Sequence, residues 1–178
     1  MKVEVKPLSF LSKTIYMLNH GGLLLTSIGN AGKPNVMTIG WGLIGTLWRK
    51  PVFTVAVRPS RYTYRLIEET GCFTVNVPAK GMKEVVKYCG TFTGRVHNKF
   101  MEKGLNTTPG ITVIAPTIAE CAINYECKVL YKVKVRPKTL TEEVCSKCYP
   151  KGNYHTLYFG EILKTLAQGY KEKHEVKR

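Results

Sequence analysis

The sequence has no aspartate: its 12 acidic residues are all glutamates, against 27 lysines and arginines. This absence excludes mechanisms that depend on a pair of Asp carboxylates or on magnesium held by Asp. The formal net charge is +15, and no acidic residue occurs between Val5 and Ile67. An anionic ligand or partner is therefore expected, although a basic surface that serves only solubility would have the same composition.

Long apolar runs are absent as well. The longest candidate, GGLLLTSIG at residues 21–29, has the length of a strand and falls short of the about 18 residues of a membrane span. MKVEVKPLSF has no apolar signal region, so no membrane association and a cytoplasmic location are expected. No repeat or linker occurs, which favours a single domain over residues 1–178. No helix-turn-helix, RNA-binding signature or basic run of five or more occurs, so nucleic acid is not an expected partner.

Residues 40–45, GWGLIG, have the glycine spacing of a dinucleotide-binding loop. In that motif a strand precedes the glycines, a helix opens on them, and an acidic residue about 20 positions later binds a ribose. Only the strand is present, in NVMTIGW. Pro51 follows too soon for a helix, and no acidic residue comes before Glu68. We therefore reject a Rossmann-type loop.

Most of the chain has the residue pattern of strands. GLLLTSI, PNVMTIGW, VFTVAV, CFTVNV and YHTLYFGEIL are rich in β-branched and aromatic residues. Cys127–Arg136 alternates between an apolar and a mostly basic face, which is typical of antiparallel sheets. Short helices are predicted from Ser60, as N-cap, to Gly71 and in KGMKEVVKYCG before Gly90. The expected fold is mainly β, an antiparallel barrel with a few short helices.

Two basic stretches could bind an anion. The helix that opens at Ser60 follows Arg58 and includes Arg61, and free N–H groups at a helix start suit a phosphate. The alternative is that Ser60 only caps the helix while the arginines face water. In TGRVHNKF, residues 93–100, Lys99 could neutralise a phosphate or a ring carbonyl, or be an ordinary surface charge.

An ordered set of segments resembles a known family. PNVMTIGW, RPSRYTYRLIEETGCFTVNVP, CGTFTGRVHNKF, YECKV and NYHTLYFGEI together resemble the flavin reductase-like family, which includes flavoredoxins and archaeal ferric reductases. The resemblance covers about residues 22–163 and leaves 164–178 as a C-terminal tail. It implies an antiparallel FMN-binding split β-barrel, a Greek-key barrel, in agreement with the strand pattern. It also implies a homodimer with an FMN in each of two sites near the interface.

The resemblance assigns residues to each part of the FMN. Along the flavin ring would lie Asn35, Met37, Thr38, Gly40 and Trp41, where glycines let the backbone approach a flat ligand. Around the phosphate would lie Arg58, Ser60, Arg61 and Thr63. Lys99, in the segment similar to the family's SGR-x-x-DKF, would approach the cofactor and favour its anionic reduced form. His155, at the histidine of the family's GDH-x-L-x-x-GE, would border the open face where a nicotinamide or acceptor docks. The alternative for His155 is a solvent-exposed strand histidine.

The sequence departs from the family pattern in three places. Asn98 replaces an acid and Thr93 a serine, which changes the cap of that turn. EEVCSKCYPKGN is an insertion-like loop that carries Cys145 and Cys148 as C-x-x-C. This pair could be a redox dithiol, half of a four-thiolate metal site completed by a second chain, or inert. The other cysteines are predicted, from strand or helix patterns, to be small core residues: Cys72, Cys89, Cys121 and Cys127.

The resemblance implies an FMN-dependent oxidoreductase. NADH or NADPH would give hydride to FMN, which would pass electrons to free flavin, a ferric complex or a redox protein. The alternative is a flavoredoxin-like electron carrier without efficient NAD(P)H oxidation. The basic surface suits both, because NADPH and an acidic redox protein are anions. A basic binding module with no cofactor would require the ordered resemblance to be accidental.

Overall fold

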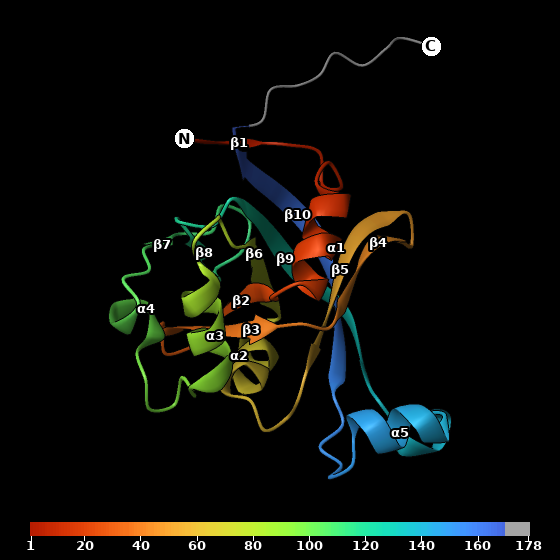
Figure 1. The fold of residues 1–178 in the computed structure, drawn as a ribbon. Helices are drawn as coiled ribbons and strands as arrows, with labels where there is room; N and C mark the ends of the chain where they lie inside the picture. The colour runs from red at the N-terminus through yellow and green to blue at the C-terminus, as the bar shows by residue number, and fades with distance from the viewer. Residues whose placement is uncertain (170–178) are drawn as a thin grey trace.

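The computed structural model describes residues 1–169. Antiparallel strands dominate it, with short helices between them (Figure 1). The strands are β1 (Lys2–Glu4), β2 (Leu23–Ile28), β3 (Pro34–Ile39), β4 (Gly42–Leu47), β5 (Lys50–Val57), β6 (Cys72–Val77), β7 (Thr107–Thr108), β8 (Thr117–Ile118), β9 (Ile123–Lys134) and β10 (Thr156–Gln168). The helices are α1 (Leu11–Asn19), α2 (Tyr62–Thr70), α3 (Lys83–Thr91), α4 (Lys99–Glu102) and α5 (Glu142–Cys148), with a 3₁₀ turn at Pro137–Thr139.

The strand order forces the main sheet to curl. Its order is β3-β2-β6-β9-β10-β5-β4, with β1 added on β10. β3 and β4 stand at opposite ends of this order, yet only Gly40 and Trp41 separate them along the chain. Flat, the two strands would lie about 28 Å apart, whereas the link reaches about 11 Å. The sheet therefore curls until its two ends approach each other, as in a split barrel, although β3 and β4 are not hydrogen-bonded neighbours. We call the Gly40–Trp41 link with the adjoining strand ends the seam.

The barrel interior is filled by aromatic and aliphatic side chains from the central strands. Phe53, Phe73, Tyr125 and Tyr158 are almost fully buried, and the rings of Phe53 and Tyr125 meet edge to face at 5.6 Å. Burial of one such side chain stabilises the fold by about 1.5–3 kcal/mol. A second apolar cluster lies under α3 and α4 against β2 and β3. This packing fixes the helices that flank the seam.

Most predicted elements are confirmed, and the differences have identifiable causes. The C-x-x-C segment, expected to be a loop, contains α5, which Thr141 caps through a hydrogen bond from the Val144 N–H. Gly90 lies inside α3 and does not end it. Cys121 is buried but lies in a bend between β8 and β9, outside any strand or helix. β1 and α1 were not predicted, because each is short and depends on contacts with the sheet.

The C-terminal boundary differs from the expected tail. β10 continues past residue 163 to Gln168, because its second half pairs with both β9 and β1. Residues 164–168 are therefore part of the sheet. The segment KEKHEVKR, residues 171–178, lies outside the described residues. Within residues 1–169, no helix is both long and apolar enough to cross a bilayer.

The apolar face predicted for the second half of β9 is not buried in this chain. Tyr131 and Val133 are 48% and 36% exposed, and Leu43 on β4 is 69% exposed. Trp48 joins them, with its ring 6.0 Å from that of Tyr131. We call Leu43, Trp48, Tyr131 and Val133 the hairpin face.

Candidate functional site

A pocket of about 430 Å³ opens at the seam. Its walls come from β3, the end of β5, the start of α2, the end of α3 with the residues that follow, α4, and the residue before β10. The residues predicted from the resemblance to bind FMN or border its open face all line it: Asn35, Met37, Thr38, Gly40, Trp41, Arg58, Ser60, Arg61, Thr63, Lys99 and His155. The structure thus brings together residues that lie as far as 120 positions apart in the sequence, from Asn35 to His155. Their contact with FMN stays a prediction.

One end of the pocket presents hydroxyl groups. The buried Asn35 amide donates to Thr63 Oγ1 at 2.7 Å, and the Asn153 amide donates to Ser60 Oγ at 2.7 Å. Because each hydroxyl accepts in these bonds, each keeps its own proton to donate. Ser60 was predicted to cap α2, and this is wrong: the N-cap is Arg61, with no side-chain cap bond. The oxygen of Ser60 is turned to Asn153 instead.

Three arginines stand at the same end, and they are not equivalent. The Arg58 guanidinium donates to the backbone carbonyls of Cys148, Gly152 and Asn153 at 3.1–3.4 Å. Arg58 therefore holds the segment after α5 against the pocket wall, in addition to lining the pocket. Arg95 donates to the Ser60 carbonyl at 3.3 Å. No acidic side chain among the described residues lines this pocket, so Arg61 and Arg95 leave it electropositive.

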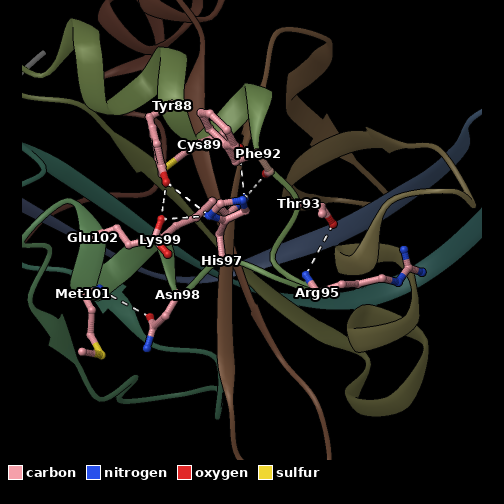
Figure 2. Close-up of polar contacts among 10 residues, drawn as sticks. All are labelled: Tyr88, Cys89, Phe92, Thr93, Arg95, His97, Asn98, Lys99, Met101 and Glu102. Atoms are coloured by element: carbon pink, nitrogen blue, oxygen red, sulfur yellow. Dashed lines mark hydrogen bonds and ion pairs between the residues drawn. The ribbon is translucent and has the colours of Figure 1, made fainter.

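Lys99, at the start of α4, is held in place in the pocket wall by backbone carbonyls (Figure 2). It is 3% exposed, and its Nζ donates to the carbonyls of Cys89 and Phe92 at 3.1 Å each. Burial lowers the pKa of Lys99. Asn98 caps α4 by accepting from the Met101 N–H at 3.4 Å, which confirms the altered cap. One of the three ammonium protons remains for a ligand.

His155 stands beside Trp41 at the mouth of the pocket. Its ring centroid is 4.9 Å from that of Trp41, and its Nδ1 lies 2.9 Å from the Tyr149 hydroxyl. Burial, and then the charges of Arg58 and Arg61, lower the pKa of His155 to about 4. The imidazole is therefore neutral at pH 7. The alternative of a solvent-exposed strand histidine is wrong, since the side chain is buried.

The lowered pKa of His155 predicts an acid-dependent loss of stability. The unfolded chain, with a histidine pKa near 6.5, binds a proton that the folded protein rejects until about pH 4. The stability that the neutral His155 contributes to the folded protein is fully present above pH 6.5 and is lost as the pH falls towards 4. Between pH 7 and 4.5, the native protein should lose about 2 kcal/mol more unfolding free energy than His155→Gln. Urea denaturation at both pH values measures this, and equal losses in the two proteins would contradict it.

The glycines of GWGLIG have separate roles. Gly40 lines the pocket, and a Cβ there would meet no atom within 4 Å. A Cβ on Gly42 would come within 2.6 Å of the Thr54 carbonyl oxygen, so Gly42 serves the close β4–β5 pairing. Gly45 faces open space away from the pocket. The expectation that these glycines approach a ligand therefore applies to Gly40 alone.

Cys145 and Cys148 lie on α5, outside the pocket lining. Both thiols are free and partly exposed, and Cys145 Sγ is 3.6 Å from the Tyr154 hydroxyl. Within residues 1–169, no group of three or more His, Cys, Asp or Glu residues could hold a metal ion. A redox role, or a metal role shared with a second chain, stays a prediction.

The sequence analysis missed part of the pocket wall. The additional lining residues that it did not single out are Ile39, Ala56, Tyr62, Cys89, Gly90 and Phe92. Cys89, Gly90 and Phe92 directly precede TGRVHNKF, so their position beside that motif was an available signal. Tyr149, which reaches His155 from outside the lining, had no signal in the sequence.

The barrel, split at one seam and with an acid-free pocket there, places the protein among the antiparallel split β-barrels. A family model described as flavin reductase like domain matches residues 16–173. The chain belongs to this family. An uncharacterized protein of Archaeoglobus fulgidus is 33% identical over 154 residues, covering 85% of this chain and 77% of its own length. A protein of Pyrococcus abyssi is 30% identical over 148 residues, covering 82% of this chain and 71% of its own length.

Solved structures share the fold. Flavoredoxin of Desulfovibrio vulgaris (Miyazaki F) superposes with a TM-score of 0.69 at 26% identity, over 83% of this chain and 69% of that one. Flavoredoxin from Methanosarcina acetivorans superposes with a TM-score of 0.65 at 29% identity, over 86% of this chain and 69% of that one. An FMN-binding domain of a flavin reductase-like enzyme from Shewanella baltica superposes with a TM-score of 0.67 at 22% identity, over 98% of this chain and 81% of that one. The predicted fold class is confirmed.

Proposed function

We propose that the protein is an FMN-dependent oxidoreductase that binds FMN in the seam pocket and takes hydride from NADH or NADPH. The observation that carries the proposal is the convergence of all the predicted FMN-binding residues on one acid-free pocket. The acceptor would be free flavin, a ferric complex or a redox protein. The two flavoredoxins, at 26% and 29% identity, support a flavin as the cofactor.

The residues present fit FMN at both of its ends. The pocket volume of about 430 Å³ lies in the usual range of about 300–1,000 Å³ for small-molecule sites. Arg61, Arg95 and the hydroxyls of Ser60 and Thr63 suit a dianionic phosphate. At the other end, Gly40 and the backbone of β3 leave room for a flat ring beside Trp41. No carboxylate in the described lining opposes the phosphate.

Bound FMN supplies the two-electron chemistry, and the protein supplies position and charge. Arg61, which lines the pocket, would neutralise the phosphate and fix that end of the cofactor. Arg95, outside the lining but bonded to the Ser60 carbonyl, would add positive charge at the same end. The ammonium of Lys99 favours negative charge in the pocket. His155 stays neutral at pH 7, so it acts as a hydrogen-bonding group and carries no proton to the reaction.

A flavoredoxin-like electron carrier is the second candidate. The flavoredoxin neighbours favour it, and a basic surface attracts an acidic redox protein. In this role the protein would hold FMN but oxidise NADH and NADPH inefficiently.

The absorption spectrum of the purified protein tests both candidates. It is recorded before and after anaerobic addition of NADH or NADPH, and the released cofactor is identified by mass. A yellow protein that contains FMN and bleaches at once supports the reductase and names the donor. Colour without bleaching favours the carrier. A colourless protein that does not take up added FMN contradicts both.

We further propose a homodimer formed through the hairpin face. This face is apolar and exposed, and Trp48 and Arg49 form the β4–β5 turn with φ of 53° and 59°. A bulky residue in this region is strained by about 1–2 kcal/mol, and such strain often accompanies function. Sedimentation equilibrium should give twice the chain mass, with Trp48→Lys shifted towards the monomer. A monomer at micromolar concentration in the native protein would contradict the dimer.

A further inference from the structure

Tyr149 belongs to the insertion-like segment EEVCSKCYPKGN, and it contacts His155 in the pocket wall from outside. Its hydroxyl lies 2.9 Å from Nδ1 of His155, and its ring meets that of His155 edge to face at 5.5 Å. Tyr149 does not itself line the pocket. Its ring also contacts two other lining residues, Trp41 at 6.2 Å and Arg58 at 5.3 Å, but its hydroxyl meets the pocket wall at His155.

The position of Tyr149 is fixed from several sides. The Arg58 guanidinium lies 5.3 Å from the centre of its ring and donates to the carbonyls of Cys148, Gly152 and Asn153. Tyr154 stacks on the ring at 4.8 Å. The Tyr149 N–H donates to the Cys145 carbonyl at 3.0 Å, which ties the residue to α5. Because these contacts hold the hydroxyl in one place, it can determine which nitrogen of the His155 imidazole carries the proton.

The direction of the hydrogen bond decides the tautomer. The Tyr149 hydroxyl contacts two groups of His155: Nδ1 at 2.9 Å and the backbone N–H, which can only donate to it. Among the described residues, Nδ1 is therefore the one acceptor that the hydroxyl proton reaches. If Nδ1 carried the proton, the buried hydroxyl would accept it and leave its own proton unpaired, which costs about 1–3 kcal/mol. Burial also raises the pKa of Tyr149, so the hydroxyl keeps its proton. The hydroxyl is therefore the donor and Nδ1 the acceptor.

We propose that Tyr149 fixes His155 in the Nε2–H tautomer, so that the pocket offers a neutral N–H donor to the carboxamide oxygen of a bound nicotinamide. Tyr149 is a positioning residue, and the nicotinamide part rests on the proposed function. A neutral imidazole suits a carbonyl acceptor, and burial, together with the nearby Arg58 and Arg61, lowers the pKa of His155 and keeps it neutral at pH 7. His155 matches the histidine of the family pattern, whereas Tyr149, which fixes its tautomer, comes from the segment that follows α5 in this chain.

The tautomer is read directly in the full-length, flavin-free protein labelled with ¹⁵N-histidine. Long-range ¹H–¹⁵N spectra at pH 7 should show His155, assigned with His155→Gln, protonated on Nε2. Tyr149→Phe keeps the ring but loses the hydroxyl, and should give a mixture of tautomers. Tyr154→Phe removes a hydroxyl from the same stack without touching His155, and should change nothing. An Nδ1–H signal in the native protein, or an unchanged Tyr149→Phe spectrum, would overturn the proposal.

Binding to the FMN-loaded protein tests the ligand. Loss of one neutral hydrogen bond predicts that Tyr149→Phe raises the Kd for the active nucleotide about 2–10-fold, with FMN affinity unchanged. Tyr154→Phe should bind both ligands as the native protein does. An unchanged Kd for NADH and NADPH would overturn the nicotinamide assignment. Because the tautomer is read without flavin, a failure of the reductase function and a failure of Tyr149 as a positioning residue are distinguishable.

Discussion

Replacement of Arg61 by alanine is expected to weaken FMN binding by about 10–100-fold and to leave riboflavin binding unchanged. Arg61 lines the end of the pocket proposed to hold the phosphate, and a hydrogen bond to a charged group contributes about 1.5–3 kcal/mol. Riboflavin has the same ring and no phosphate. Quenching of flavin fluorescence gives both dissociation constants in the same protein.

Arg65→Ala is the matched control, because it removes the same charge from the same helix. Arg65 pairs with Glu69 on the solvent side of α2 and does not line the pocket. It should change FMN affinity less than twofold at physiological salt, because long-range charge effects are screened. Equal weakening by both variants would mean that only net charge matters, and equal loss of riboflavin would place Arg61 at the ring.

Replacement of Lys99 by methionine is expected to lower the unfolding free energy of the flavin-free protein by about 3 kcal/mol. The ammonium is buried and donates to the Cys89 and Phe92 carbonyls. Methionine fills the space but leaves both carbonyls without this donor, at about 1–3 kcal/mol each. For a chain of this size the melting temperature should fall by roughly 6–12 °C. Differential scanning calorimetry measures the fall.

Lys99→Gln separates the structural role of Lys99 from its charge. The amide of glutamine still donates hydrogen bonds, so it should recover part of the stability that methionine loses. It has no charge, so the potential of the bound flavin should fall in both variants. A Lys99→Met protein as stable as the native one would show that the two carbonyl bonds contribute nothing. An unchanged potential would show that the ammonium does not act on the cofactor.

The sequence was sufficient for the local structure and for most of the site. Segments rich in β-branched and aromatic residues were predicted to form strands, and the buried Phe53, Phe73 and Tyr158 lie in three of them, β5, β6 and β10. The left-handed Gly71, with φ of 64°, ends α2 as expected. The order of motifs placed the candidate cofactor residues although they come from distant segments.

The features that the sequence did not reveal depend on distant partners. Ser60 has the residue type of an N-cap, but Asn153, which is 93 positions away, binds its hydroxyl. Arg58 lines the pocket and also donates to the carbonyls of Cys148 and Gly152, and its contact with a phosphate stays a prediction. The residue pattern gives β9 an apolar side, and at Tyr131 this side is exposed.

The sequence by itself determined the strands, the acid-free basic stretch and the motifs, because these depend on residue type and on spacing along the chain. Only the tertiary structure decided where the two ends of the sheet meet, and therefore where the pocket lies. The short Gly40–Trp41 link draws the two ends of the sheet together only once the strand order is set. Tyr149 and His155 are six positions apart, but the segment between them is held by Arg58, which lies 90 positions before Cys148. Hydrogen bonds from so distant a residue form only after the chain has folded, so no local pattern could reveal that Tyr149 sets the state of the imidazole.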